Sequence, residues 1–197
     1  MWRRIILLGW LCWLVTISVE GAPLVVAQYP WQEQGGRVPT RVLDYLETRL
    51  DRALHVPLNG FLGRVSYLSD DDCERAWAET LAEAAPVQGH KARLKDLMKP
   101  LADKLGADLV VYPVVERYAE YQGMGWRFDR GPILHSWVTL RLVGYDRRRD
   151  EVFNKSVTRS YSDEYSSSGT AASLAQECLE RVLTATALHA RISDKGE

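Results

Sequence analysis

His135 and Ser136 are neighbours in the sequence, and a serine paired with a histidine is the combination that many hydrolases use as nucleophile and base. The surrounding residues alternate between apolar and polar types, which predicts a strand, and neighbouring strand residues point to opposite faces of a sheet. The two side chains therefore cannot act on each other. The sequence also contains no Gly-x-Ser-x-Gly, His-Glu-x-x-His or phosphate-binding glycine motif.

Two groups of acidic residues have the composition of a cation site. Asp70, Asp71 and Asp72 are consecutive, and Asp163 and Glu164 precede a run of serines. Both groups precede a predicted helix, where acidic and hydroxyl side chains cap the helix and complement its positive end. The four histidines lie far apart without ligand spacing to a cysteine. We therefore predict no catalytic residue, no metal site and no cofactor.

An aromatic and basic group stands in a glycine-containing segment between Gly123 and Gly131. Trp126, Arg127 and Phe128 are consecutive there, and the segment lies between two predicted strands, which indicates the tip of a hairpin. Two alternatives stay open, because the rings either fold back on the sheet or form a contact surface. Aromatic residues and arginine anchor protein interfaces. We therefore treat these three residues as candidates for binding a partner protein.

Cys73 and Cys178 raise the question of a disulfide bond, because exported proteins with paired cysteines often form one. Each cysteine stands on the apolar side of a predicted helix, where a thiol behaves as a small hydrophobic side chain. The sequence leaves both alternatives open, a bond or two thiols in the core.

The amino-terminal residues have the order of a secretory signal peptide, with Arg3 and Arg4 ahead of an apolar run and small residues. The run of about 15 residues is shorter than a membrane-spanning helix. The small-residue rule allows cleavage after Ala27, which we favour, or after Gly21 or Ala22. An uncleaved anchor is the other alternative, and it would be the chain's sole contact with a membrane. We expect an exported protein, periplasmic or extracellular.

The sequence predicts one folded domain at residues 40–192. Residues 1–27 are the predicted signal peptide, residues 28–39 form a predicted flexible lead-in without periodicity, and residues 193–197 form a tail. The net charge of the whole chain is −1, which disfavours nucleic acid as a partner because such a protein needs a basic face.

Periodicity along the domain predicts an α/β (α+β) fold. Its mixed sheet has about four strands, the last three of them an antiparallel meander, and helices pack on the sheet. Pro113 cannot donate a ladder hydrogen bond, so we expect it at a sheet edge or a bulge. The predicted order is helix 40–54, strand 61–68, helices 73–85 and 90–105, strands 109–121, 134–142 and 153–165, and helix 170–190.

The segment from Gly106 to Asp108, followed by an apolar strand and later by Tyr145 and Asp146 before a charged turn, resembles a family of bacterial envelope domains. The family is that of the TolB amino-terminal domain and CsgG. The resemblance implies a mixed sheet with helices packed on it, in scaffold or assembly proteins rather than catalysts. This sequence departs from the family in lacking a lipid-attachment cysteine.

These patterns predict an exported, non-enzymatic module of the bacterial cell envelope that serves as a protein-binding scaffold or assembly factor. Its partner would be an envelope protein or a second copy of this chain, bound through the sheet edge and the aromatic hairpin. The alternative function is a small exported hydrolase with an unrecognised active site.

Overall fold

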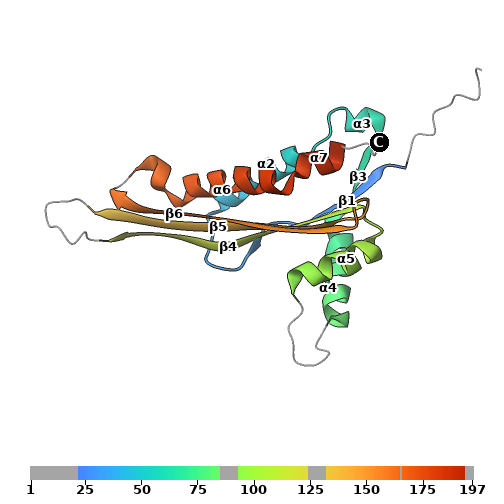
Figure 1. Cartoon of the computed structure of the whole chain (residues 1–197), viewed down its shortest axis with the longest axis horizontal. Helices are drawn as coiled ribbons and strands as arrows, with labels where there is room; N and C mark the ends of the chain where they lie inside the picture. The colour runs from blue at the N-terminus through green and yellow to red at the C-terminus, as the bar shows by residue number, and fades with distance from the viewer. Residues whose placement is uncertain (1–21, 85–92, 124–131, 165, 194–197) are drawn as a thin grey trace, which may run out of the picture.

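The structure is a computed structural model and describes residues 22–84, 93–123, 132–164 and 166–193. It has three layers, with a sheet between two layers of helices (Figure 1). Helices α2, α6 and α7 lie on one face, which we call the α6 face, and helices α4 and α5 lie on the opposite face, the α5 face. The predicted α+β class is therefore confirmed.

The central sheet is mixed and has six strands among the described residues, two more than predicted. Their order is β3-β1-β4-β5-β6, and β2 also pairs with β4. Strands β4, β5 and β6 form the predicted antiparallel meander, whereas β1 pairs in parallel with β3 and β4. The strands are β1 (Leu24–Gln28), β2 (Gln32–Glu33), β3 (Val65–Tyr67), β4 (Leu109–Gly123), β5 (Ile133–Asp146) and β6 (Glu151–Glu164).

The longer helices α2, α4, α5 and α6 each bury an apolar stripe against the sheet or a neighbouring helix. Helix α5 ends at Gly106, whose φ of 61° is the left-handed conformation that glycine adopts most easily. The helices are α2 (Thr40–Leu54), α3 (Asn59–Leu62), α4 (Asp70–Glu83), α5 (Leu94–Leu105), α6 (Ala171–Thr186) and α7 (Leu188–Ser193).

The sheet separates two apolar cores, and each core holds one cysteine. Cys73 belongs to the core on the α5 face, and Cys178 belongs to the core on the α6 face. Both thiols are buried and free, so the proposed disulfide is not present and the alternative of two core thiols describes the structure. The physical reason is that β4 and β5 lie between the two side chains.

The segment before residue 40 is packed more closely than the sequence indicates. Residues 24–28 form strand β1, which lies inside the sheet between β3 and β4. In the predicted lead-in, Tyr29, Trp31 and Val38 are buried. Gly35 lies so close to the backbone of Glu116 that a side chain there would collide with it. The expected flexibility of residues 28–39 therefore disagrees with the structure, because this segment binds along the edge of β4.

The predicted strand 61–68 is shorter in the structure, where strand β3 begins at Val65. The residues before it form helix α3, in which Phe61 is 89% exposed. Asn59 stabilises this arrangement, because its side chain accepts from the Val65 N–H at 2.7 Å and donates to the Val65 carbonyl at 2.8 Å. The sequence shows only that residue 61 is apolar. That alone does not distinguish a phenylalanine exposed on a short helix from one in a strand.

Candidate functional site

The sheet extends well beyond the helices on its α5 face. Helices α4 and α5 lie beneath the end of the sheet that holds β1 and β3, and no described element covers the same face toward the other end (Figure 1). We call the uncovered end the distal half of the sheet. It consists of residues 117–123 of β4, 133–139 of β5 and 158–164 of β6, which pair with one another throughout.

A bulge in β4 determines which side chains occupy this uncovered face. Val115 pairs with Leu140 and Arg117 pairs with Thr139, so Glu116 is an extra residue. Before the bulge Val115 packs in the core of the α6 face, and after it Tyr118 packs there. The bulge therefore directs the odd-numbered residues of distal β4 to the α5 face. The sequence shows no signal for this bulge. Pro113 lies three residues before Glu116, between the segment of β4 that pairs with β1 and the segment that pairs with β2.

Side chains of three strands form the uncovered surface, which we call the open sheet face. Cross-strand partners share a face of the sheet, and the register therefore defines its members. It contains aromatic rings, hydroxyl groups, one guanidinium and one carboxylate: Arg117, Ala119, Tyr121, Gly123, Ile133, His135, Trp137, Thr139, Thr158, Ser160, Ser162 and Glu164.

Two stacked pairs of planar groups lie on the open sheet face. The Arg117 guanidinium lies 4.2 Å from the centre of the Trp137 ring, and the rings of Tyr121 and His135 stack at 4.9 Å with 21° between their planes. Trp137 is 42% exposed and Tyr121 is 63% exposed. Large apolar rings at this exposure, side by side on one surface, are typical of contact sites.

Hydroxyl groups line the β6 side of the same face. Ser162 Oγ and His135 Nδ1 are 2.9 Å apart, and the hydroxyls of Thr139 and Thr158 are 3.0 Å apart. A hollow of about 270 Å³ lies among the face residues, from Arg117 and Tyr121 on β4 to Ser160 and Ser162 on β6. Rings and hydroxyls from three strands therefore surround one shallow cavity.

The structure pairs His135 with Ser162 rather than with Ser136. Ser136 lies on the other face and is buried, as the strand alternation predicts. Ser162 is the cross-strand neighbour of His135, which the sequence analysis missed because the pairing of β5 with β6 brings together residues 27 positions apart. In the described part of the chain no carboxylate hydrogen-bonds to the His135 ring.

The outer side of β6 is an open strand edge. Strand β6 pairs with β5 along all 14 residues without a register shift, and no other strand among the described residues pairs with it. It contains no proline. Exposed and half-buried residues alternate from Ser156 to Ser162. The edge thus presents a long, regular row of backbone groups beside the open sheet face.

A larger cavity of about 400 Å³ lies at the carboxyl ends of β1 and β3, where the chain leaves for opposite faces of the sheet. Its lining includes Gln28, Asp51, His55 and Tyr67. The Gln28 amide donates to Asp51 at 2.5 Å, and the Tyr67 hydroxyl donates to the Leu54 carbonyl at 2.6 Å. Burial and the nearby Asp51 raise the pKa of Tyr67. These polar groups hold α2 against the strand ends.

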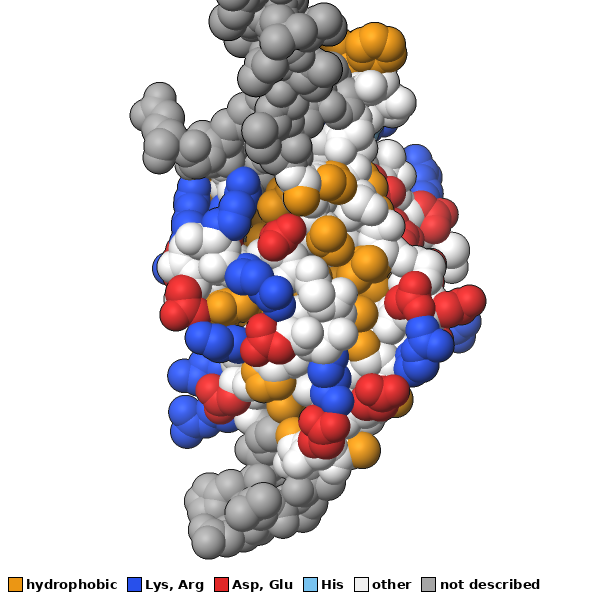
Figure 2. Space-filling model, turned by 90° about the vertical axis from the view of Figure 1, so that its right-hand side faces the viewer, with side chains coloured by type: hydrophobic (Ala, Val, Ile, Leu, Met, Phe, Trp, Pro, Cys, Tyr) orange, Lys and Arg blue, Asp and Glu red, His pale blue; other side chains and the backbone are white. Residues whose placement is uncertain are grey.

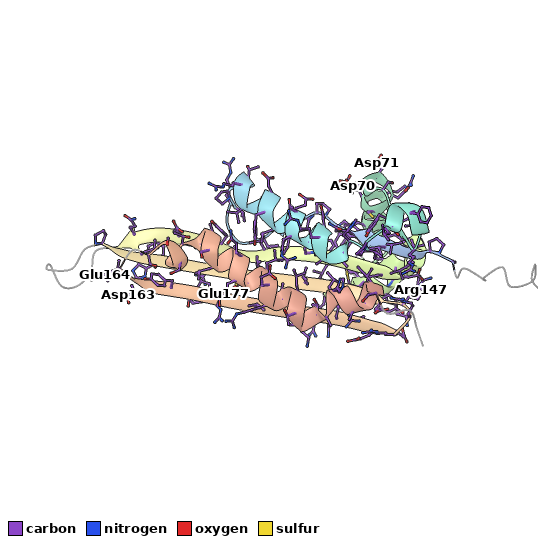
Figure 3. The ribbon with its side chains drawn as sticks, turned by 90° about the horizontal axis from the view of Figure 1, so that it is seen from above. Asp70, Asp71, Arg147, Asp163, Glu164 and Glu177 are labelled. Carbon is purple, nitrogen blue, oxygen red and sulfur yellow. The ribbon has the colours of Figure 1, made fainter. Side chains whose placement is uncertain are left out.

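Of the two acidic groups predicted to cap helices, the first does so, whereas Asp163 and Glu164 end strand β6 and do not cap α6. Ser69 is the N-cap of α4, and Asp70, Asp71 and Asp72 form its first turn. Thr170 caps α6, and Glu120 of β4 accepts from the first N–H of that helix at 2.6 Å. Asp163 and Glu164 lie at the opposite end of the sheet from Asp70 and Asp71 (Figure 3). Within the described ranges, no group of histidine, cysteine and acidic residues could hold a metal ion.

The end of the molecule that holds α5, α7 and the β5–β6 turn is rich in ion pairs. Basic side chains gather along one margin of this end, with acidic ones among them (Figure 2). The buried pair of Arg191 and Asp146, 3.2 Å apart, joins α7 to β5, and Arg191 also pairs with Glu151 at 2.9 Å. These contacts attach the carboxyl-terminal helix to the sheet.

The predicted partner-binding residues Trp126, Arg127 and Phe128 lie outside the described residues. The strands that flank them, β4 and β5, are confirmed, and the hairpin between Gly123 and Gly131 remains a prediction. Within the part of the chain that is described, no helix has the length and apolar character needed to cross a membrane.

Comparison with known proteins gives similarity at the level of solved structures. No family profile and no curated protein matches the chain. The hypothetical protein CT253 from Chlamydia trachomatis is similar, with 13% identity over 87% of this chain and 99% of that one and a TM-score of 0.43. The lipoprotein GNA1162 from Neisseria meningitidis has 16% identity over 84% and 99%, with a TM-score of 0.39.

The carboxyl-terminal domain of LpoB from Salmonella enterica is also similar, with 10% identity over 75% of this chain and 90% of that one and a TM-score of 0.32. At these scores the likenesses assign neither a family nor a function. The resemblance to the TolB and CsgG families stays a prediction.

Proposed function

We propose that this protein is an exported, non-catalytic module of the bacterial cell envelope that binds another protein by strand addition at β6. The observation that supports the proposal is the open edge of β6, 14 residues long and free of bulges against β5. A strand of a partner can continue the sheet there through backbone hydrogen bonds alone. The envelope location follows from the predicted signal peptide and the resemblance to TolB and CsgG domains.

Edge strands of soluble proteins usually carry features that prevent such pairing, and β6 has few of them. Proline, bulges and short length are absent. Lys155 is its only lysine, and Arg159 is held at 3.0 Å by Glu177 of α6. Ser156, Thr158, Ser160 and Ser162 are small polar residues that leave the backbone accessible. The edge therefore tolerates the approach of another strand.

The partner is an envelope protein or a second copy of this chain. The paired ends of β4 and β5, Gly123 and Ile133, lie at the same end of the sheet as half of the β6 edge, and the hairpin that the sequence predicts between Gly123 and Gly131 carries Trp126 and Phe128. In this proposal the edge supplies backbone hydrogen bonds, and the hairpin supplies aromatic contacts beside it.

A pair of proline substitutions tests the role of the edge. Successive N–H groups of a strand point to opposite sides, so one of Lys155→Pro and Ser156→Pro removes a hydrogen bond to β5 and the other blocks the outer edge. We expect one variant to melt at a clearly lower temperature and the other to stay folded. The folded variant should raise the Kd of self-association or partner binding at least about tenfold.

Light scattering measures self-association, and affinity capture from envelope extract measures binding of another protein. Lys155→Ala and Ser156→Ala serve as the matched controls, because each removes the same side chain as the corresponding proline variant and keeps the N–H group. Wild-type association in the folded proline variant would refute strand addition at β6.

A small hydrolase is the second candidate function, and the contact of Ser162 with His135 at 2.9 Å is the observation that favours it. A neutral His135 could accept the hydroxyl proton and so activate the serine as a nucleophile. Hydrolysis of an activated ester such as p-nitrophenyl acetate tests this function. A Ser162→Ala variant that hydrolyses the ester as fast as the wild type would eliminate the serine as the nucleophile.

A further inference from the structure

We infer that the open sheet face binds an acidic polysaccharide, a sugar chain that carries carboxylate groups. Strand addition at β6 would use the backbone groups of that strand, and the rings and Arg117 of this face play no part in it. The inference rests on three properties of the face, namely its rings, its hydroxyl groups and its charge.

The rings provide flat apolar surfaces of the size of a sugar ring. Trp137 and Tyr121 point from neighbouring strands into the same uncovered region and remain 42% and 63% exposed. A pyranose ring has one face made of C–H groups and a rim of hydroxyls, so its C–H face packs on an aromatic ring while its rim stays hydrated. The partners of these rings, Arg117 and His135, stack on them and hold them in place.

The hydroxyl groups lie where the rim of such a sugar would reach. Ser160 pairs with Trp137 across β5 and β6, and Ser162 pairs with His135, so each of these β5 residues has a serine beside it on β6. Hydroxyl groups both donate and accept hydrogen bonds, as sugar hydroxyls do. The shallow hollow of about 270 Å³ between rings and serines has room for a sugar unit rather than a long apolar side chain.

The charge around Arg117 favours an anion, because Glu164, the carboxylate of the same face, lies at its far end beside Ile133. Arg117 has its guanidinium over Trp137 and forms no ion pair with a described carboxylate. The nearest acidic residue in the sequence, Glu116, is occupied by Arg141 at 2.8 Å and by the Ser156 hydroxyl at 3.0 Å. Arg117 is therefore a cation available to a ligand. A carboxylate would gain a charge-assisted hydrogen bond there.

An acidic peptide is a less suitable occupant, because peptide recognition by side chains relies on apolar pockets that anchor alternate residues. The position between the rings belongs to Ala119, and the β6 side is lined by hydroxyls. The face thus offers stacking and hydroxyl contacts over its whole width, which match a sugar chain. Binding of an acidic peptide is one of the outcomes that the following experiment distinguishes.

Isothermal titration calorimetry with three polymers tests the inference. Polygalacturonate has sugar rings and carboxylates, dextran has sugar rings without charge, and polyglutamate has carboxylates without sugar rings. We expect polygalacturonate to bind most tightly and its binding to weaken as salt rises. Tighter binding of dextran, equal or tighter binding of polyglutamate, or no binding of polygalacturonate would overturn the inference.

Variants assign the binding to this face. Tyr121→Ala and Trp137→Ala should each raise the Kd for polygalacturonate about tenfold, because each removes a stacking surface. Arg117→Gln should raise it about fivefold and reduce its salt dependence. Phe61→Ala, at an exposed ring on α3, is the control and should bind as the wild type does. Unchanged binding in both Tyr121→Ala, whose ring is largely exposed, and Arg117→Gln would overturn the inference even if Trp137→Ala misfolds.

Discussion

The two halves of the long sheet differ in what covers their α5 face. The proximal half is the end of the sheet that α4 and α5 cover. Its residues Val110, Tyr112, Val143 and Tyr145 are buried against these helices. In the distal half the same strands continue with no described helix on that face, and its side chains are mostly rings and hydroxyls, with Arg117 at one end and Glu164 at the other. On the α6 face both halves are covered, because the core there runs from β1 to the start of α6.

This difference shows that the side chains on the α5 face change in type where helices α4 and α5 end, although the strands themselves continue. Along β5, the residues of the α5 face change from Tyr145 and Val143 to Thr139, Trp137 and His135 as the strand leaves the helices. Backbone pairing is the same throughout, since β4, β5 and β6 stay in register apart from one bulge. A strand that extends past its helices exposes a surface for contact.

The largest expected effect concerns β1, the inner strand of the proximal half that the amino-terminal segment contributes. A chain that begins at Gln28 lacks most of β1, including the buried Leu24, Val26 and Ala27. We expect it to lose cooperative unfolding, whereas a chain that begins at Ala22 should retain it, as thermal circular dichroism would show. Cleavage of the predicted signal after Gly21 or Ala22 would keep β1 intact. Amino-terminal sequencing of exported material starting at Gln28, together with a folded product, would contradict this expectation.

The second prediction tests how much helix α5, which covers the proximal half, contributes to the stability of the protein. Met98 of α5 is fully buried against the proximal half, and Met98→Ala should lower the free energy of unfolding by about 2–5 kcal/mol. Urea denaturation measures the change, and Lys95→Ala on the same helix is the control. A loss below about 1 kcal/mol would mean that α5 contributes little to the proximal half.

A pH dependence tests the two separate cores. Burial raises the pKa of the Cys73 thiol and of the Cys178 thiol to about 11, from an ordinary 9.0. Between these values the unfolded chain releases both protons while the folded chain retains them, so stability falls as the pH rises. Since a tenfold change in acidity corresponds to about 1.4 kcal/mol, each thiol should account for about 2 kcal/mol of the loss.

Urea denaturation at pH 9 and at pH 11 measures this loss. The Cys73→Ala, Cys178→Ala double variant should lose less stability than the wild type over the same interval. Labelling of the denatured, non-reduced wild type should also find both thiols free. If the wild type and the double variant lose the same stability over this interval, the thiols are not buried as the structure describes.

The smallest effect is expected on the open sheet face. Trp137→Ala removes a larger side chain than Met98→Ala does, yet Trp137 is 42% exposed and lies on the face of the distal half. We expect its free energy of unfolding to fall by about 1 kcal/mol. Urea denaturation of both variants under the same conditions compares the two halves directly. A larger loss for Trp137→Ala than for Met98→Ala would reverse the comparison.

Local patterns were enough to predict much of the fold. The meander of β4, β5 and β6 follows from alternation, helices α2, α4, α5 and α6 follow from apolar stripes, and the end of α5 follows from Gly106. These features depend on residues close in sequence, through side-chain periodicity and backbone conformation. Strand β1 (Leu24–Gln28) was missed because all but its last residue fall inside the predicted signal peptide at residues 1–27 and the strand has no alternation of its own.

The sequence by itself therefore determined the α+β class, the antiparallel meander and the alternating chemistry of its distal strands. Only the tertiary structure decided that β1 inserts between β3 and β4, that Cys73 and Cys178 lie on opposite faces, and that His135 meets Ser162. It also decided, through the bulge at Glu116, that Arg117 and Tyr121 share a face with Trp137. The physical reason is that these outcomes depend on register and layer order between residues far apart in sequence, and local periodicity contains no information about either.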